Sequence, residues 1–169
     1  TIYGTEIFSD PDVKVPLISD MSSDILSRPV DVSKYNLIYA GAQKNLGPSG
    51  ATLVIVKNDA LGKTTRLIPT MLDYKTHVAN DSMFNTPSTL PVFGCLQTLI
   101  WLKDLGGIPV IEKINKAKAE MLYTEIERNK LFSATVPDHA EAGAARGLRA
   151  GHRTGRRHPR PRGIVRQSG

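Results

Sequence analysis

The sequence predicts an α/β fold, in which short buried strands precede two longer helices. Three apolar runs, each bounded by turn residues, have the length of buried strands. Two later stretches, residues 90–105 and 109–130, have helical character. Apolar residues make up 40% of the 169-residue chain and charged residues 22%, which is the balance of a soluble globular protein.

The three predicted strands cover residues 15–19, 37–40 and 51–56. None alternates polar with apolar residues, a pattern typical of strands covered on both faces. Glycine and proline between the second and third strands, in residues 45–50, predict turns. Between the first and second strands, residues 31–35 are too few for a long helix, and we expect a loop with a helical turn there.

The two predicted helices differ in character. Residues 90–105 are mostly apolar, so we expect this helix to be mostly buried. Pro109 lies in the first turn of the second helix, where proline is tolerated. That helix is amphipathic, with one apolar face formed by Ile111, Ile114, Leu122 and Ile126. Residues 63–90 are polar and predict an irregular segment.

The net charge of +6 comes from the C-terminal end of the chain. Basic and acidic residues balance over residues 1–134, whereas residues 135–169 hold eight arginines and two acidic residues. This segment is rich in Arg, Gly, Ala and Pro and offers almost no apolar residue for a core. We expect residues 135–169 to be a disordered tail or the translation of a shifted reading frame.

Several classes of protein are disfavoured. No apolar run is long enough to span a membrane, and the first residues do not form a signal peptide. The single cysteine, Cys95, cannot form an internal disulfide, which is typical of a reducing compartment. We therefore expect a cytoplasmic protein without a membrane contact, and we expect no metal site.

Chemically useful side chains follow two of the predicted strands. Asp20 ends the first, and Gly41-Ala42-Gln43-Lys44 follows the second. Ligands of open α/β sheets collect at the carboxyl ends of strands. A carboxylate and a lysine at one edge suit a flat cofactor, whereas the glycine patterns of P-loops and dinucleotide-binding sites are absent from the sequence. Taken singly, such a lysine is usually solvated and such an aspartate usually forms a turn.

Three blocks of sequence, in this order and spacing, resemble the phosphoserine aminotransferases, which are fold-type I pyridoxal-phosphate enzymes. They are Asp-Met-Ser-Ser-Asp-Ile-Leu-Ser at residues 20–27, Ile-Tyr-Ala-Gly-Ala-Gln-Lys-Asn-Leu-Gly-Pro-Ser-Gly at residues 38–50, and Asp-Ser-Met-Phe-Asn-Thr-Pro-Ser-Thr at residues 81–89. The resemblance extends over about residues 1–134.

This resemblance implies a domain organisation. Residues 1–107 would form the C-terminal part of the large cofactor-binding domain, a mostly parallel sheet with helices. Residues 108–134 would form the helix that leads into a truncated small α+β domain, followed by the tail at 135–169.

The resemblance also implies that pyridoxal 5'-phosphate is the cofactor. Lys44 would form the Schiff base with it and then shuttle protons, which makes Lys44 the catalytic residue. Asp20 would pair with the pyridine nitrogen, and Gln43 would donate its side-chain amide to the phosphate. Thr1 would contact the ring hydroxyl.

Two further residues imply a homodimer with shared active sites. Asn85 and Thr86 match family residues that reach the cofactor phosphate of the neighbouring subunit. The implied reaction transfers an amino group between glutamate and 3-phosphohydroxypyruvate, with phosphoserine and 2-oxoglutarate as products. It belongs to L-serine biosynthesis and, in some bacteria, to pyridoxine biosynthesis.

The chain also departs from the family. Segments before and after the matching blocks are missing, and Gly151-His152-Arg153 comes too early to be the family's substrate-binding segment. The substrate-binding arginines therefore cannot be assigned. We expect little or no transamination by this chain alone.

Three alternatives stay open. Another fold-type I enzyme, such as a cysteine desulfurase, needs a reactive cysteine on a mobile loop, and Cys95 lies in an apolar helix instead. The arginine-rich tail would bind nucleic acid without specificity, because no aromatic residues interleave with its arginines. The chain could also be a remnant without catalytic function.

Overall fold

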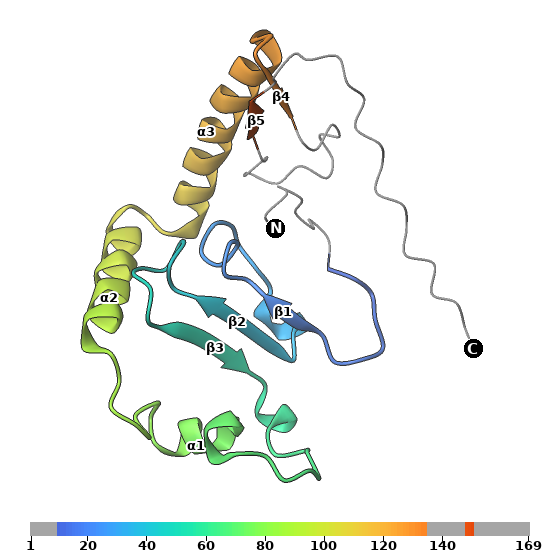
Figure 1. Ribbon diagram of the computed structural model, residues 1–169, viewed down its shortest axis with the longest axis vertical. Coiled ribbons are helices and arrows are strands. Elements are labelled where there is room, and N and C mark those ends of the chain that lie inside the picture. The colour runs from blue at the N-terminus through green and yellow to red at the C-terminus, as the bar shows by residue number, and fades with distance from the viewer. Residues whose placement is uncertain (1–9, 135–147, 151–169) are drawn as a thin grey trace.

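A computed structural model describes residues 10–134 and 148–150 of the chain (Figure 1). Its strands and helices, in chain order, are β1 (Ile18–Asp20), β2 (Leu37–Gly41), β3 (Thr52–Val56), α1 (Tyr74–Ala79), α2 (Thr89–Asp104), α3 (Ile108–Arg128), β4 (Phe132–Ala134) and β5 (Leu148–Ala150). Three short 3₁₀ helices lie between them, at Val32–Lys34, Asn58–Ala60 and Thr70–Leu72.

The strands β1, β2 and β3 form one sheet in that order. β1 is parallel to β2, with Asp20 opposite Tyr39, and β2 is antiparallel to β3, with Tyr39 opposite Val54. The length of the connection explains why one pair is parallel and the other antiparallel, because a parallel pair needs a crossover of about a dozen residues or more. Residues 21–36 are long enough for that crossover. Residues 42–51 instead turn back directly and are closed by a bond from the amide of Ala42 to the carbonyl oxygen of Ala51 at 3.0 Å.

The core of the molecule lies on one face of this sheet. Ile38 is 1% exposed and Ala40 is fully buried, and both pack with Met21, Ile25 and Tyr35 from the connecting segments. Tyr39, which points to the opposite face, is 39% exposed. The expectation that the strands are covered on both faces is therefore wrong for the described part of the chain.

The predicted helix boundaries agree with α2 and α3 to within two residues. Gly106 and Gly107 separate the two helices and adopt φ angles of 108° and 82°, a left-handed conformation that side chains disfavour. The irregular segment predicted at residues 63–90 contains α1, whose first turn is capped by Asp73. Six residues are too few for a periodic signal, and the Asp73 cap was the only local sign of this helix.

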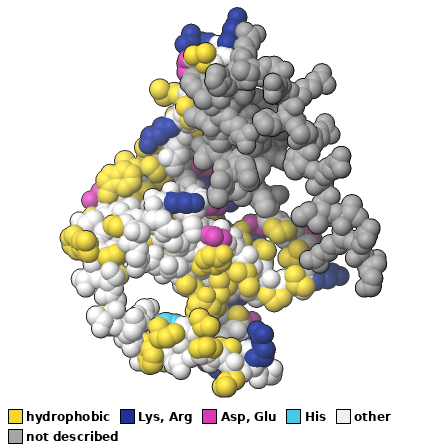
Figure 2. All heavy atoms as spheres, in the orientation of Figure 1, with side chains coloured by type: hydrophobic (Ala, Val, Ile, Leu, Met, Phe, Trp, Pro, Cys, Tyr) yellow, Lys and Arg dark blue, Asp and Glu magenta, His cyan; other side chains and the backbone are white. Residues whose placement is uncertain are grey.

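The prediction that α2 is mostly buried is wrong in this structure. Within α2 only Pro91 and Leu102 are buried. Its N-terminal half packs on the turn after β2 so closely that a Cβ atom on Gly94 would lie 2.5 Å from Cδ of Pro48. The other sides of the helix, in both of its halves, expose large apolar side chains, and Figure 2 shows hydrophobic side chains at the surface over α2 and the sheet. The exposed apolar residues of α2 are Leu90, Val92, Phe93, Leu96, Leu99, Ile100 and Trp101.

Helix α3 leads away from the three-stranded sheet toward β4 and β5 (Figure 1). On its predicted apolar face Ile126 is buried, whereas Leu122 is exposed. β4 follows α3 and pairs antiparallel with β5. Of the tail at 135–169 the structure describes only β5, and the remainder of that prediction lies outside the described residues. None of the described helices combines the length and hydropathy that crossing a lipid bilayer requires.

Candidate functional site

Asp20 and Lys44 lie at the same edge of the sheet. Asp20 is the last residue of β1, and Lys44 lies in the turn that follows β2. Because β1 and β2 are parallel neighbours, their carboxyl ends meet at this edge. The positive charge of Lys44 contributes to lowering the pKa of the Asp20 carboxyl.

The carboxylate of Asp20 is held by its own loop. Its Oδ1 atom accepts hydrogen bonds from the backbone amide of Ser22 at 2.9 Å and from the Ser22 hydroxyl at 2.6 Å. These two bonds are the main reason why the pKa of Asp20 lies below its usual range, because they favour the charged form. The adjacent Asp20 charge in turn raises the pKa of the Tyr39 phenol. Asp20 is thus an ionised acceptor at neutral pH.

Hydrogen bonds join the Asp20 loop (residues 20–28) to the Lys44 turn (residues 41–50). The Ser22 hydroxyl oxygen accepts from the backbone amide of Gly41 at 2.9 Å. The side-chain amide of Asn45 donates to the carbonyl oxygens of Ser23 and Ile25, at 3.1 Å each. The two segments, which come from different parts of the chain, therefore have a fixed relative position.

The amine of Lys44 is exposed and has a partner across this junction. Its Nζ atom donates to Oγ of Ser23 at 2.6 Å. Gln43 is also exposed, and its side chain folds back over Gly41, where an added Cβ atom would lie 2.6 Å from Oε1 of Gln43. The structure thus brings Asp20, Gln43 and Lys44 to one edge of the sheet.

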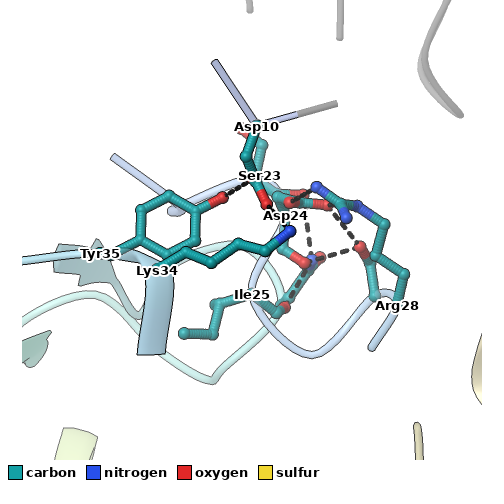
Figure 3. Close-up of polar contacts among 9 residues, drawn as sticks. Asp10, Ser23, Asp24, Ile25, Arg28, Lys34 and Tyr35 are labelled. Atoms are coloured by element: carbon teal, nitrogen blue, oxygen red, sulfur yellow. Dashed lines mark hydrogen bonds and ion pairs between the residues drawn. The ribbon is translucent and has the colours of Figure 1, made fainter. Parts of the chain in front are cut away.

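Figure 3 shows two further sets of polar contacts, one within the Asp20 loop and one beside it. Arg28 donates from Nη2 and Nε to the two carboxylate oxygens of Asp24, at 2.7 Å and 3.0 Å. Asp10 accepts from the hydroxyl of Tyr35 and from Nζ of Lys34, the latter at 3.0 Å. Burial and the bond to Asp10 raise the pKa of Tyr35 to about 12. The contacts of Asp10 attach the segment before β1 to the segment that precedes β2.

Asn85 and Thr86 are placed differently. Both lie in the segment between α1 and α2, where every residue from 81 to 90 is exposed. In the part of the chain that the structure describes, the side-chain amide of Asn85 donates only to the carbonyl oxygen of Thr86, at 3.4 Å. Across the described residues, no hydrogen bond links either side chain to Asp20, Gln43 or Lys44. Thr1 lies outside the described residues.

Sequence reasoning assigned no role to three residues that organise this site. Ser22 had a local signal, because an Asp-x-Ser segment can form a turn in which the serine donates twice to the carboxylate. The same geometry recurs where Ser33 donates to Asp31, at 3.0 Å and 2.6 Å. Ser23 and Asn45 act across more than 20 residues of sequence, and no local pattern reveals such contacts.

The described side chains offer no group of three or more His, Cys, Asp and Glu that could hold a metal ion. Cys95 is a free, half-buried cysteine in α2. It faces the Lys44 turn, since a Cβ atom on Gly47 would lie 2.9 Å from its sulfur atom. Cys95 is thus a helix residue packed on a turn, which disfavours the mobile cysteine that a desulfurase needs.

Comparison with known proteins identifies the family. The aminotransferase class-V family matches residues 9–146. Among curated proteins, the phosphoserine aminotransferase of Phocaeicola vulgatus is 62% identical over 141 residues, which are 83% of this chain and 40% of that protein. The phosphoserine aminotransferase of Flavobacterium psychrophilum is 61% identical over 136 residues, or 80% of this chain and 38% of the relative. The chain therefore spans about 40% of the length of the relatives it matches.

Solved structures share the fold. A phosphoserine aminotransferase from Bacillus circulans subsp. alkalophilus has a TM-score of 0.82 at 40% identity, covering 89% of this chain and 42% of the other. A phosphoserine aminotransferase from Trichomonas vaginalis, solved with pyridoxal phosphate bound, has a TM-score of 0.80 at 36% identity, covering 85% of this chain and 40% of that one. The described residues thus form an α/β part of the large domain of a fold-type I enzyme, and the chain belongs to the class-V aminotransferases.

Proposed function

We propose that this chain carries the lysine half of the cofactor site of a phosphoserine aminotransferase, and that its cofactor is pyridoxal 5'-phosphate. The observation that carries the proposal is the junction of the Asp20 loop and the Lys44 turn, which presents an ionised carboxylate and an exposed amine at one edge of the sheet. Relatives at about 60% identity with the name phosphoserine aminotransferase support it.

The residues at this edge fit the chemistry of that cofactor. Pyridoxal phosphate supplies an aldehyde that reacts with amines and a ring that takes up electrons from the substrate. Asp20 would hold a proton at the ring nitrogen, a role that requires the ionised carboxylate found here. Lys44 would bind the aldehyde carbon and then move protons at the substrate, and Gln43 would donate to the phosphate. A contact of Thr1 with the ring hydroxyl stays part of the proposal.

The second half of the site would come from another copy of the chain. Asn85 and Thr86 are exposed and have no hydrogen bond to the Lys44 side of the site in the described residues. In a homodimer they would reach the cofactor phosphate of the neighbouring subunit. This arrangement gives a function to a polar segment that contributes nothing to the core of its own chain.

For the whole enzyme we propose amino transfer between glutamate and 3-phosphohydroxypyruvate in L-serine biosynthesis. The proposed enzyme would act on a phosphorylated amino or keto acid, with glutamate and 2-oxoglutarate as the second amino and keto acid. Free Cys95 supports a reducing, cytoplasmic location. The arginines that select a phosphorylated substrate stay unassigned, and the 169-residue chain alone would transaminate little.

The test is covalent capture of the cofactor. The purified chain is mixed with pyridoxal phosphate, its near-visible absorbance is recorded, and borohydride is added. We expect a band in the mixture and a pyridoxyl group fixed on Lys44, located by peptide mass spectrometry. Lys44→Ala should lose both signals. Lys57→Ala, which removes an exposed lysine near the end of β3, should keep them. Equal labelling of many lysines would contradict the proposal.

The shared site has its own test. Lys44→Ala and Asn85→Ala chains are mixed under conditions that allow subunits to exchange, and fixation of pyridoxal phosphate is measured at low cofactor concentration. One of the two sites in a mixed dimer would carry an intact Lys44 and an intact Asn85. Fixation should therefore exceed that of either variant alone. A mixture that only averages the two variants would exclude a shared site.

A further inference from the structure

Two adjacent serines in the Asp20 loop serve different partners. Ser22 donates to the carboxylate of Asp20 at 2.6 Å, and Ser23 accepts from Nζ of Lys44 at 2.6 Å. The backbone turn at residues 22–23 therefore directs one hydroxyl to each of the two groups that the proposed function uses.

Hydrogen bonds fix the backbone of Ser23 at the preceding residue and at its own carbonyl group. The residue before it, Ser22, is fixed by the bonds to Asp20 and Gly41. The carbonyl of Ser23 itself accepts from the side-chain amide of Asn45 at 3.1 Å. Since the backbone of Ser23 is fixed in this way, its hydroxyl is a stationary partner for a mobile side chain.

Lys44 needs such a partner. A lysine side chain has four rotatable bonds, and confining it costs about 2 kcal/mol of conformational entropy. An exposed amine without a fixed contact would sample many rotamers, few of which direct Nζ toward Asp20. A serine hydroxyl can accept from an ammonium group and donate to a neutral amine, so it can hold Lys44 in both protonation states.

We propose that Ser23 is a positioning residue for Lys44, which holds the ε-amine at the Asp20 edge before and during capture of the cofactor aldehyde. The inference rests on the proposed function for its consequence, because the held amine is useful only if it reacts there. The contact between Ser23 and Lys44 exists in the chain without cofactor, so this contact and the proposed binding of the cofactor can be tested separately.

The first measurement needs no cofactor. The chain is labelled with a trace of acetic anhydride between pH 7 and 11, and the rate at each lysine is read by mass spectrometry. In Ser23→Ala the labelling rate of Lys44 should rise about twofold to tenfold relative to Lys57, the range that corresponds to one hydrogen bond of ordinary net strength. Ser23→Thr, which keeps a hydroxyl, should stay near the wild-type rate.

The matched control is Ser33→Ala. Ser33 makes the same pair of bonds to Asp31 that Ser22 makes to Asp20, but it lies in the 3₁₀ helix at Val32–Lys34 and has no bond to Lys44. The Lys44 rate should not change in this variant. Circular dichroism of each variant establishes that the chain has kept its fold.

The second measurement is the rate at which pyridoxal phosphate becomes fixed on Lys44 when borohydride is added at successive times. We expect Ser23→Ala to slow this rate by a similar factor. An unchanged acetylation rate in Ser23→Ala would overturn the inference, and so would a changed acetylation rate with an unchanged rate of fixation. If the wild type fixes no cofactor while its acetylation rate depends on Ser23, the proposed function fails and the hold of Ser23 on Lys44 stands.

Discussion

Two regions of this chain carry residues of the proposed site, and they differ in how many contacts their side chains make within the chain. In the first, the Asp20 loop and the Lys44 turn, polar side chains form hydrogen bonds with backbone and side-chain groups 19 to 22 residues away. In the second, residues 81–104, the polar segment is exposed throughout and is followed by a helix with apolar residues at its surface. The chain's own folding thus fixes the Asp20 and Lys44 part of the proposed site and leaves the Asn85 and Thr86 segment exposed.

The difference follows from what each region can bury. The first region rests on the sheet core around Ile38, and its polar groups have partners at the edge of that core. The second region has helix α2, whose apolar residues lie all around its axis, while only one side packs on the turn after β2. Exposed apolar surface of this kind is typical of a surface that contacts other protein. The contacts that stabilise the fold are therefore concentrated in the first region and the core beneath it.

The largest expected effect is on the stability of the sheet core on which the first region rests. Ile38→Ala should lower the free energy of unfolding by about 2–5 kcal/mol, because it removes a buried side chain and leaves a cavity. Leu90→Ala, at a residue that is 74% exposed, should change it by less than about 0.5 kcal/mol. Urea unfolding followed by circular dichroism measures both. Equal effects would mean that α2 is packed as tightly as the sheet.

A smaller effect should follow when two of the hydrogen bonds between the Asp20 loop and the Lys44 turn are removed. Asn45→Ala loses the donors to the carbonyl oxygens of Ser23 and Ile25. At about 0.5–1.5 kcal/mol for each hydrogen bond, the free energy of unfolding should fall by about 1–3 kcal/mol. Hydrogen exchange should also accelerate in residues 21–28. If stability falls without faster exchange there, Asn45 does not hold the loop.

Alkaline pH provides a third test, because Tyr35 belongs to the core on which the first region rests. The pKa of Tyr35 is raised to about 12, from about 10 in an unfolded chain. Below pH 10 both states keep the proton and the stabilisation is complete. Between pH 10 and 12 the unfolded state releases it first, so stability falls as pH rises. Tyr35→Phe should cost about 1 kcal/mol at pH 8, and this difference should shrink as the pH approaches 12.

Measuring the urea midpoint of both proteins between pH 8 and 12 gives this difference directly. The subtraction cancels the titration of the other tyrosines and of the lysines. Curves that stay parallel between pH 10 and 12 would show that folding does not raise the pKa of Tyr35.

The sequence predicted the features that depend on local pattern. Of the five strands in the described residues, β2 and β3 lie within one residue of their predicted bounds, and both long helices lie within two. β1 begins three residues later than predicted, and the sequence analysis did not predict β4 and β5. Asp20 and Lys44 lie at one edge of the sheet, as expected. The antiparallel pairing of β2 and β3 was also accessible, because residues 42–51 are too few for a crossover. The sequence did not predict in the same way which residues are buried. An apolar helix such as α2 predicts that something covers it, and the sequence does not say whether the cover belongs to the same chain.

The contacts inside the site also show which features could be predicted from the sequence and which could not. Asp-x-Ser at residues 20–22 is a local motif, and its bonds could have been predicted. The contact of Ser23 with Lys44 and the bonds of Asn45 depend on the relative position of two segments, which the fold sets and no spacing reveals. Resemblance to a family identified Lys44 and Asp20, but it gave no reason for their geometry.

The smallest expected effect is at Asn85, and it is informative because it is small. The side chain of Asn85 is exposed and, among the described residues, donates only to the carbonyl oxygen of its neighbour Thr86. Asn85→Ala should therefore change the free energy of unfolding by less than about 0.5 kcal/mol. Asn45→Ala is the matched comparison, since it removes the same amide group from a position where the amide has two partners. A residue that folding does not require is free to serve a ligand or a second copy of the chain. A loss above 1 kcal/mol in Asn85→Ala would instead give this segment a structural role within its own chain, and the contrast between the two regions would no longer hold.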